Sequence, residues 1–262
     1  MLKLCVCAET VFPELKFLER IKKIAMLGYP AIEFWFWDEK DKDVDQIAKL
    51  TKELKIEIND IVVNAPDGSI GGSLTKAEDK DKYLERAKET IDIAYRLNCK
   101  KLITCSGNIV EHLNSEAQIK NIISTLREVT KIAEEAGITL LLEPLNSLVD
   151  HPGYFLDSSK IGFDIVKRVN SPHLRLLYDI YHMQIMEGNI IDTIKENISL
   201  IGHFHSAGVP GRNELDLGEL NYSNIFRKIG ELNYDGCFGL EYFPKKDSEI
   251  SLREMKEILT GA

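Results

Sequence analysis

The sequence has no apolar run long enough to span a membrane, and its first residues do not form a signal peptide. The segment MLKLCVCAE lacks both the length and the cleavage pattern of such a signal. Cysteine is scarce: the five residues show no zinc-type pair spacing, and their odd number argues against a disulfide framework. Cys5 and Cys7 alternate within an apolar run, which indicates small buried side chains. We therefore expect a cytoplasmic protein with reduced thiols and no membrane partner.

Basic residues are fewer than acidic ones. Lysine and arginine number 33 against 42 aspartates and glutamates, so the formal net charge is −9. A nucleic-acid groove needs clustered basic residues, so we expect no nucleic-acid partner. No glycine fingerprint of the GxGxxG kind follows the first apolar run, which weakens a dinucleotide-binding interpretation. The remaining expectation is a small-molecule substrate, and homo-oligomer formation is left open.

No linker or low-complexity segment divides the 262 residues, and a hydrophobic content of 44% suits one large domain over residues 1–262. Apolar runs alternate with amphipathic helical segments, which predicts parallel strands joined by crossover helices. Eight such units favour a closed (β/α)8 TIM barrel over an open doubly wound sheet. The expected strands are 2–8, 31–36, 56–63, 101–105, 138–143, 174–178, 200–205 and 237–241. The expected helices are 14–27, 44–54, 81–97, 115–136, 158–169, 190–197, 222–232 and 248–259.

Four consecutive expected strands end in a side chain that can bind a metal ion: Glu143, Asp179, His205 and Glu241. In a parallel barrel the carboxyl ends of all strands meet at one rim, so these side chains would surround one point. A single acidic residue at a strand end is more often solvated or paired with lysine, but four in succession favour the metal interpretation. Three carboxylates and one imidazole are mostly hard ligands, which suits one Mn²⁺, Mg²⁺ or Co²⁺ ion, with zinc as a further option.

Two polar residues lie just beyond these four in the sequence. His182 follows Asp179 by three residues, and Arg212 lies in the loop after His205. The forked donors of arginine match a substrate carboxylate. The alternative for Arg212 is a loop salt bridge with Glu214 or Glu219.

Other side chains near the expected rim are weaker candidates. Trp35 and Trp37 alternate, which predicts that both lie on one side of a strand; either could stack on a sugar, but core packing is favoured for at least one. Alternation also predicts that Phe204 faces away from His203 and His205. The structural interpretation is preferred for His112, His151 and His203, and the rim candidates are Asn64 and Asn108.

These residues lie in runs that resemble hydroxypyruvate isomerases, which are xylose-isomerase-like TIM-barrel isomerases and epimerases. The runs are LLLEPLN, YDIYHMQIMEGN, HFHSAGVPGRNELDLGELNY and GLEYFP. The similarity is close from Glu143 to Pro244 and looser in the first half, where FLERIKKIAMLGYPAIEF carries it. At the position of His205 some hydroxypyruvate isomerases have glutamine, whereas ketose 3-epimerases of the group have histidine.

The resemblance implies metal ligation by Glu143, Asp179, His205 and Glu241 and an acid/base pair of Glu143 and Glu241. It also implies substrate contacts from His182 and Arg212. The expected reaction is a 1,2-proton transfer in a sugar or keto acid through a metal-stabilised enediolate. The rim runs contain no lysine motif and no second carboxylate cluster for another ion, which favours proton transfer over hydride shift.

Several other functions share this expected barrel. A ketose 3-epimerase of the tagatose or psicose type is the closest alternative, followed by a dehydratase of an inositol-type ketone. A hydrolase like the AP endonucleases would need more histidine ligands and a basic groove than six histidines and a charge of −9 supply. A barrel kept only as a metal-binding subunit would be expected to have lost ligands, and all four are present.

Overall fold

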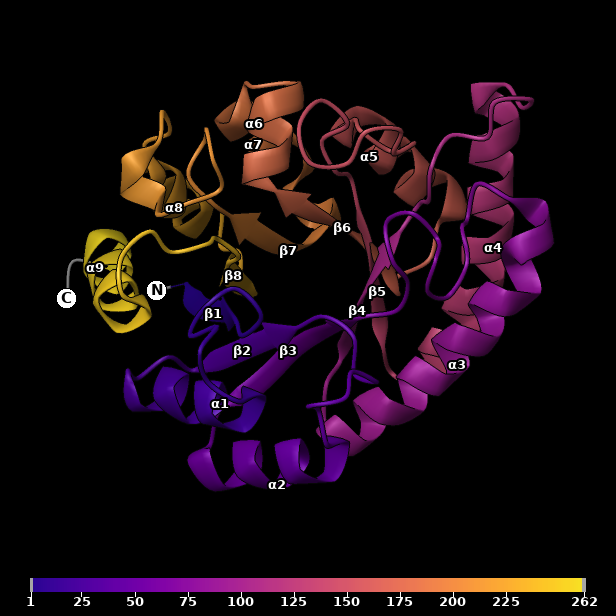
Figure 1. Cartoon of the computed structure of the whole chain (residues 1–262). Helices are drawn as coiled ribbons and strands as arrows, with labels where there is room; N and C mark the ends of the chain where they lie inside the picture. Colours follow the sequence, from indigo (N-terminus) through magenta and orange to yellow (C-terminus); the bar gives the residue numbers. More distant parts are fainter. Residues whose placement is uncertain (1, 261–262) are drawn as a thin grey trace.

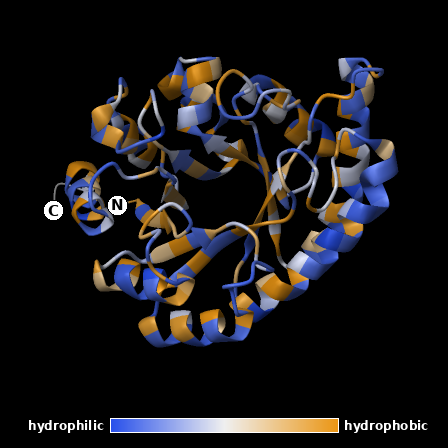
Figure 2. Ribbon diagram, in the orientation of Figure 1, coloured by the Kyte–Doolittle hydropathy of each residue, from blue (hydrophilic) through white to orange (hydrophobic). Residues whose placement is uncertain are grey.

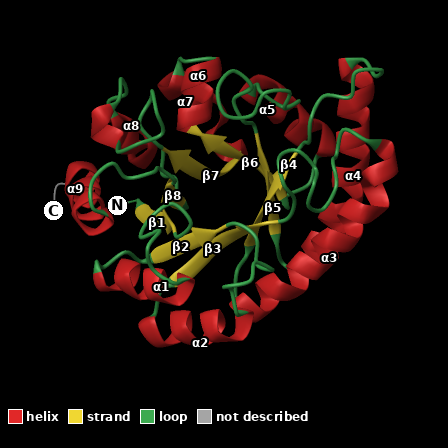
Figure 3. Ribbon diagram, viewed as in Figure 1, coloured by secondary structure: helices red, strands yellow, loops and turns green. Residues whose placement is uncertain are grey.

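Eight parallel strands close into one barrel in sequence order, and helices surround it (Figure 1, Figure 3). The computed structural model describes residues 2–260. The strands are β1 (Lys3–Cys7), β2 (Ala31–Phe34), β3 (Glu57–Val62), β4 (Lys101–Cys105), β5 (Thr139–Glu143), β6 (Leu174–Asp179), β7 (Ile201–Ser206) and β8 (Cys237–Leu240). The predicted TIM barrel is confirmed.

The α-helices are α1 (Phe17–Met26), α2 (Val44–Leu54), α3 (Lys80–Leu97), α4 (Ser115–Glu135), α5 (Ser159–Val169), α6 (Ile180–Met186), α7 (Ile190–Asn197), α8 (Tyr222–Glu231) and α9 (Ser248–Thr260). Three short 3-10 helices are η1 (Ala77–Asp79), η2 (Ile198–Leu200) and η3 (Leu215–Leu217). Each outer helix carries both hydrophobic and hydrophilic residues (Figure 2). In α1, for example, Ile21 and Ile24 are fully buried. Within residues 2–260, no helix combines the length and apolarity that crossing a bilayer requires.

The predicted elements differ from the observed ones mainly at their ends. The first helix was expected from residue 14 but begins at Phe17. Helix α6 was not expected, because it is short and starts directly where β6 ends. Asp179 makes this start stable, since its Oδ1 accepts hydrogen bonds from the backbone N–H groups of Tyr181 at 2.7 Å and His182 at 3.3 Å. One residue therefore ends a strand, caps a helix and faces the barrel mouth.

Strand β2 ends two residues earlier than expected, and this separates the two tryptophans. The chain leaves the sheet after Phe34, so strand alternation no longer decides where the following side chains point. Trp37 packs against α3, with its ring 4.7 Å from the Arg86 guanidinium and its Nε1 donating to Thr90 Oγ1 at 3.3 Å. The prediction that both tryptophans share one side is wrong, and Trp37 takes the packing role.

Alternation along β7 is confirmed by the contacts on its two faces. Phe204 is fully buried in the layer between barrel and helices, 4.9 Å from the Tyr234 ring centroid and 6.3 Å from that of Phe238. His203 and His205 instead contact Glu33 of β2, across the barrel interior. All five cysteines are buried and free, and the predicted burial of Cys5 and Cys7 is confirmed.

We predict that Phe204→Ala lowers the free energy of unfolding by about 3–5 kcal/mol, because it removes a buried ring and leaves a cavity. Chemical denaturation monitored by circular dichroism measures the change. Tyr95→Ala is the control, since Tyr95 is 80% exposed and its loss should change stability by less than about 0.5 kcal/mol. Equal effects of the two substitutions would contradict the described packing of β7 against the helices.

Candidate active site

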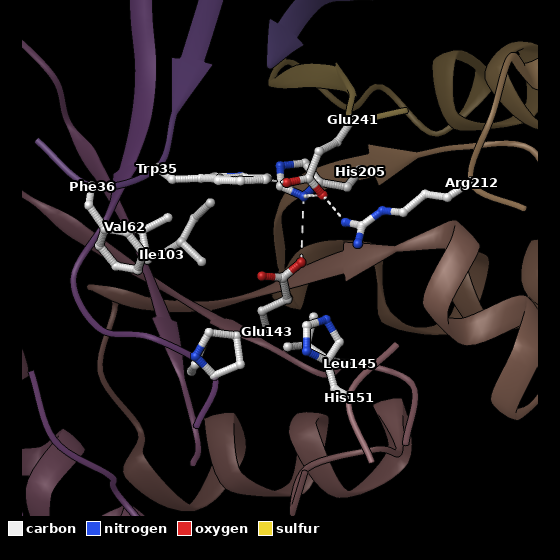
Figure 4. A pocket seen from close by; sticks show the side chains of 12 residues that line it. Trp35, Phe36, Val62, Ile103, Glu143, Leu145, His151, His205, Arg212 and Glu241 are labelled. Atoms are coloured by element: carbon white, nitrogen blue, oxygen red, sulfur yellow. Dashed lines mark hydrogen bonds and ion pairs between the residues drawn. The ribbon is translucent and has the colours of Figure 1, made fainter. Parts of the chain in front are cut away.

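The four predicted strand-end residues come together at the carboxyl rim of the barrel. Glu143 ends β5, Asp179 ends β6, His205 lies one residue before the end of β7, and Glu241 directly follows β8. One potential ligand atom from each lies within 4.8 Å of the others. His205 Nδ1 is 3.3 Å from Glu241 Oε2 and 3.5 Å from Glu143 Oε1. Figure 4 shows the two glutamates pointing toward each other, with the histidine ring beside them.

This donor set fits a divalent cation. All four residues are buried, and neither ring nitrogen of His205 has a hydrogen-bond partner within residues 2–260. A buried polar atom without a partner costs free energy, and three carboxylates in one buried place repel each other. One ion held by oxygen and imidazole donors would remove both costs, and such donors suit Mg²⁺, Mn²⁺ or Co²⁺.

Burial and neighbouring charges shift the pKa values of these groups in different directions. Burial raises the pKa of Asp179 to about 7, and it also raises the pKa of Glu143. Burial disfavours the ionised form of Glu241 too, but the charges of His205 and Arg212 outweigh it and hold that pKa well below its usual value. Burial likewise opposes protonation of His205, yet Glu241 and Glu33 raise its pKa well above the ordinary value. Of the three carboxylates, Glu241 is therefore the one that the protein's own cations keep ionised, whereas Glu143 and Asp179 hold protons more tightly than usual.

The two glutamates differ in their hydrogen bonds. Trp35 Nε1 donates to Glu241 Oε1 at 2.9 Å, and Arg212 Nη2 donates to Glu241 Oε2 at 2.6 Å. The Glu143 carboxylate has only its 3.5 Å contact with His205 among the described residues. Glu241 is thus held in one orientation as a carboxylate, whereas Glu143 keeps free acceptor capacity toward the cavity.

Arg212 pairs with Glu241, so the alternative salt bridge with Glu214 or Glu219 is wrong. The Glu214 carboxylate instead accepts hydrogen bonds from the backbone N–H groups of Lys245 and Lys246. Glu219 accepts from Gln184 Nε2 at 3.2 Å. The guanidinium lies 5.4 Å from the centroid of the Tyr181 ring.

The loop that presents Arg212 is tightly bonded. Arg212 has a left-handed backbone with φ 56°, its N–H donates to Gly208 O at 2.9 Å, and its carbonyl accepts from Phe243 N at 2.8 Å. A Cβ on Gly208 would lie 2.4 Å from Glu214 O, so only glycine allows this close approach. A non-glycine residue held in the left-handed region is uncommon and is often found at functional sites.

His182 is fully buried behind the cavity wall. Its Nδ1 accepts from the Asn146 side chain at 2.6 Å and from the Asn146 backbone N–H at 3.2 Å. Burial, with the nearby charge of Arg212, lowers its pKa well below the usual value, so the ring is neutral and Nε2 carries the proton. That Nε2 lies 3.5 Å from Asp179 Oδ2. The ring is not among the residues that line the cavity. The predicted substrate contact of His182 therefore stays a prediction.

The cavity above the four residues holds about 270 Å³. Figure 4 shows Phe36, Val62 and Ile103 gathered on one side of the cavity, with Arg212 on the opposite side. The apolar lining residues are Trp35, Phe36, Val62, Pro66, Ile103, Cys105 and Leu145. The polar lining residues are Glu143, His151, His205, Arg212 and Glu241. The structure therefore brings Trp35 and Arg212 to the cavity.

Sequence reasoning missed two residues near this site. His151 was interpreted as structural, but it lines the cavity, and its ring lies 5.5 Å from that of His182. Glu33 was not considered, although a glutamate inside the apolar run AIEF is a signal of a buried partner. Glu33, His203 and His205 form a second group whose ligand atoms lie within 4.8 Å of one another.

The two asparagines proposed for the rim do not line the cavity. The Asn64 side chain is buried and bonds to the backbone of Gly72 and Cys105. Asn108 forms an isolated backbone bridge with Tyr154. Both residues fix loops around the barrel mouth.

Residues 21–258 match the family model described as xylose isomerase-like TIM barrel. The chain belongs to this family. It is 33% identical to a putative hydroxypyruvate isomerase of Xenopus laevis, over 95% of this chain and 93% of that protein. It is 30% identical to the hydroxypyruvate isomerase of Escherichia coli strain K12, over 97% of this chain and 98% of that protein. Over 52% of each chain, it is 40% identical to a 2-oxo-tetronate isomerase of Cupriavidus necator.

Among solved structures, the crystal structure titled AP endonuclease, family 2 from Brucella melitensis aligns with a TM-score of 0.90 and 31% identity. It covers 96% of this chain and 97% of that one. The curated relatives confirm the predicted resemblance to hydroxypyruvate isomerases and the prediction that this family member is an isomerase.

We predict that the chain binds one divalent ion at the four rim residues and that Mn²⁺ raises its melting temperature. Mn²⁺ at about 100 times its dissociation constant should raise the free energy of unfolding by roughly 2.7 kcal/mol. Asp179→Asn should remove the effect while the apo protein melts as before, because asparagine caps helices as well as aspartate does. Thermal melts with and without Mn²⁺ measure the shift in melting temperature, and elemental analysis measures the number of bound ions per chain. An unchanged Mn²⁺ response in the variant would contradict ligation by Asp179.

Proposed function

We propose that this chain is a divalent-metal-dependent isomerase that moves a proton between neighbouring carbons of a short keto acid, with hydroxypyruvate as the first candidate. The observation that carries this proposal is the pair of carboxylates, Glu143 and Glu241, facing each other across one small cavity. The names of the relatives, hydroxypyruvate isomerase and 2-oxo-tetronate isomerase, support a keto-acid substrate.

The ion would be held by Glu143, Asp179, His205 and Glu241. When bound, it supplies a Lewis acid that polarises the substrate carbonyl and stabilises negative charge developing on its oxygen. The remaining chemistry belongs to side chains of this protein.

Glu143 suits the role of the base that takes a proton from the carbon beside the carbonyl. Its carboxylate has free acceptor capacity toward the cavity, and burial raises its pKa toward the range that general bases use. Glu241 suits the return step. Because Glu241 is held as a carboxylate, it must gain a proton before it can give one. When a substrate oxygen draws the Arg212 guanidinium away from Oε2, that atom is free to take the proton of the substrate hydroxyl and then pass it to the neighbouring carbon.

Arg212 suits substrate orientation. Its Nε is buried and has no hydrogen-bond partner among residues 2–260, so a donor remains for a substrate anion. A guanidinium presents parallel donors that match a carboxylate. The cavity volume, about 270 Å³, is at the small end for ligand sites and favours a short substrate over a long sugar chain.

A ketose 3-epimerase is the second candidate. It would use the same two carboxylates, with one removing the proton and the other returning it to the opposite face. His205 favours it, because the resembling 3-epimerases have histidine at this position. An endonuclease is disfavoured, because Arg212 is the one lysine or arginine among the described residues that line the cavity.

The direct test is a substrate panel assayed with Mn²⁺ or Mg²⁺ added. Hydroxypyruvate, tartronate semialdehyde and 2-oxo-tetronate represent the isomerase reactions, and psicose and tagatose represent epimerisation. Turnover of the keto acids with no epimerisation supports the first candidate, and the reverse result supports the second. Incision of DNA containing abasic sites, with no turnover of the panel, would overturn both.

Proton transfer predicts exchange with solvent. Turnover in D₂O should place deuterium on the carbon that receives the proton, detected by NMR or mass spectrometry. Glu143→Gln and Glu241→Gln should each abolish turnover, because an amide cannot accept the proton. Full retention of substrate hydrogen together with two bound ions per chain would favour hydride transfer instead.

Arg212→Lys should reduce kcat/KM for a keto acid by at least about tenfold, because lysine keeps the charge but loses the forked donors. Melting temperature should change by only a few degrees, since the cation opposite Glu241 is retained. Steady-state kinetics and thermal melts on the same preparation separate the two effects. A large fall in melting temperature with normal turnover per folded enzyme would assign Arg212 to the fold.

A further inference from the structure

A second polar group lies inside the barrel, on the side of His205 away from the cavity. Glu33 of β2 bonds to His203 of β7, with 2.8 Å between Oε2 and Nε2. His203 Nε2 is also 3.4 Å from Asp60 Oδ2, and the Asn59 side chain donates to that oxygen at 2.6 Å. The interior of such a barrel is normally filled by branched apolar side chains, so this polar group needs a reason.

These side chains are almost completely buried, with exposed fractions of 0–3%. The chain also makes room for them. A Cβ on Gly239 of β8 would lie 2.8 Å from Glu33 Oε1 and 2.8 Å from His205 Cδ2. Real Cβ atoms do not approach other atoms so closely, so glycine at this position leaves the space that Glu33 and His205 share.

Glu33 reaches His205 through the oxygen that His203 does not use. Glu33 Oε1 lies 3.2 Å from His205 Nε2, and neither of these buried atoms has a hydrogen-bond partner among residues 2–260. They are close enough for a small rotation of either side chain to form a hydrogen bond between them. The other ring nitrogen, Nδ1, faces Glu143 and Glu241. Nε2 thus faces one carboxylate in the barrel interior, and Nδ1 faces two at the rim.

We propose that Glu33 is a positioning residue that accepts a hydrogen bond from His205 Nε2–H and so keeps Nδ1 unprotonated and aimed at the metal ion. His203 and Asp60 hold the Glu33 carboxylate in turn. A histidine that binds metal through one nitrogen commonly donates its other N–H to a carboxylate, which fixes the tautomer and ring orientation. The inference rests on the metal dependence in the proposed function.

Mn²⁺ affinity of the purified enzyme, measured by isothermal titration calorimetry, tests this role. Glu33→Leu removes both acceptor oxygens and should weaken binding by about 10–100-fold. The amide of Glu33→Gln has one acceptor oxygen and can accept from only one of the two histidines. Its Mn²⁺ affinity should therefore lie between that of Glu33→Leu and that of the unmodified enzyme. Glu214→Gln is the matched control, since Glu214 is equally buried but bonds to loop backbone, and its Mn²⁺ affinity should not change.

The unmodified enzyme gives a second measurement that does not depend on how variants fold. Two-bond ¹H–¹⁵N spectra with Mg²⁺ bound should show His205 protonated at Nε2 and not at Nδ1. Thermal melts of each variant without metal distinguish a weakened site from a damaged fold. The reverse tautomer of His205 would overturn the proposal.

The outcomes separate this inference from the proposed function. If Asp179→Asn loses Mn²⁺ but Glu33→Leu binds it as tightly as the unmodified enzyme, only the positioning role fails. If neither substitution changes affinity, the proposed metal site fails as well. Two Mn²⁺ ions per chain, with one lost in Glu33→Leu, would make Glu33 and His203 ligands of a second ion and would overturn the positioning role.

Discussion

The structure depends on one electrostatic constraint: four carboxylates are gathered around a single imidazole in the barrel interior. Glu143, Asp179 and Glu241 lie on the cavity side of His205, and Glu33 lies on the other side. Like charges at such distances repel strongly where water is excluded. In the protein alone, His205 and Arg212 supply positive charge beside these carboxylates. A bound cation would add further positive charge at the point where the ligand atoms of Glu143, Asp179 and Glu241 converge. This arrangement is the one that the proposed metal dependence requires.

A closed parallel barrel is well suited to holding such a group. In the sheet register Asp179 is opposite His205, and His205 is opposite Gly239, so side chains on neighbouring strands lie at one height. Cys105 of β4 is opposite Glu143 of β5, and β5 pairs with β6 on its other side. Behind β7, the Phe204 ring packs against Tyr178 of β6 and Phe238 of β8 and fills the layer between the barrel and the helices. The barrel strands thus hold the acidic side chains close together, and the loops after β7 and β5 supply Arg212 and His151.

Residues of the same type differ in hydrogen bonding and pKa because their surroundings differ. Glu241 is bonded by Trp35 and Arg212 at its two oxygens and stays ionised. Glu143 has free capacity and a raised pKa. The two histidines of β7 differ in the same way, because His203 bonds to Glu33 within the core while His205 faces the rim. Two carboxyl groups with unequal proton affinity suit separate acid and base roles in the proposed proton transfer, and Glu143 and Glu241 form such a pair.

The sequence by itself determined the barrel, because eight alternating strand and helix patterns permit few other arrangements. It also determined which four strand ends would meet, since parallel strands share a rim. Only the tertiary structure decided the partners of Arg212, the separate places of Trp35 and Trp37, and the position of His151 in the cavity wall. It likewise decided that Glu33 lies next to His205. The physical reason is that periodicity and strand ends are local properties of the chain. Contacts between β2 and β7, or between the loops after β7 and β8, depend on how distant segments pack.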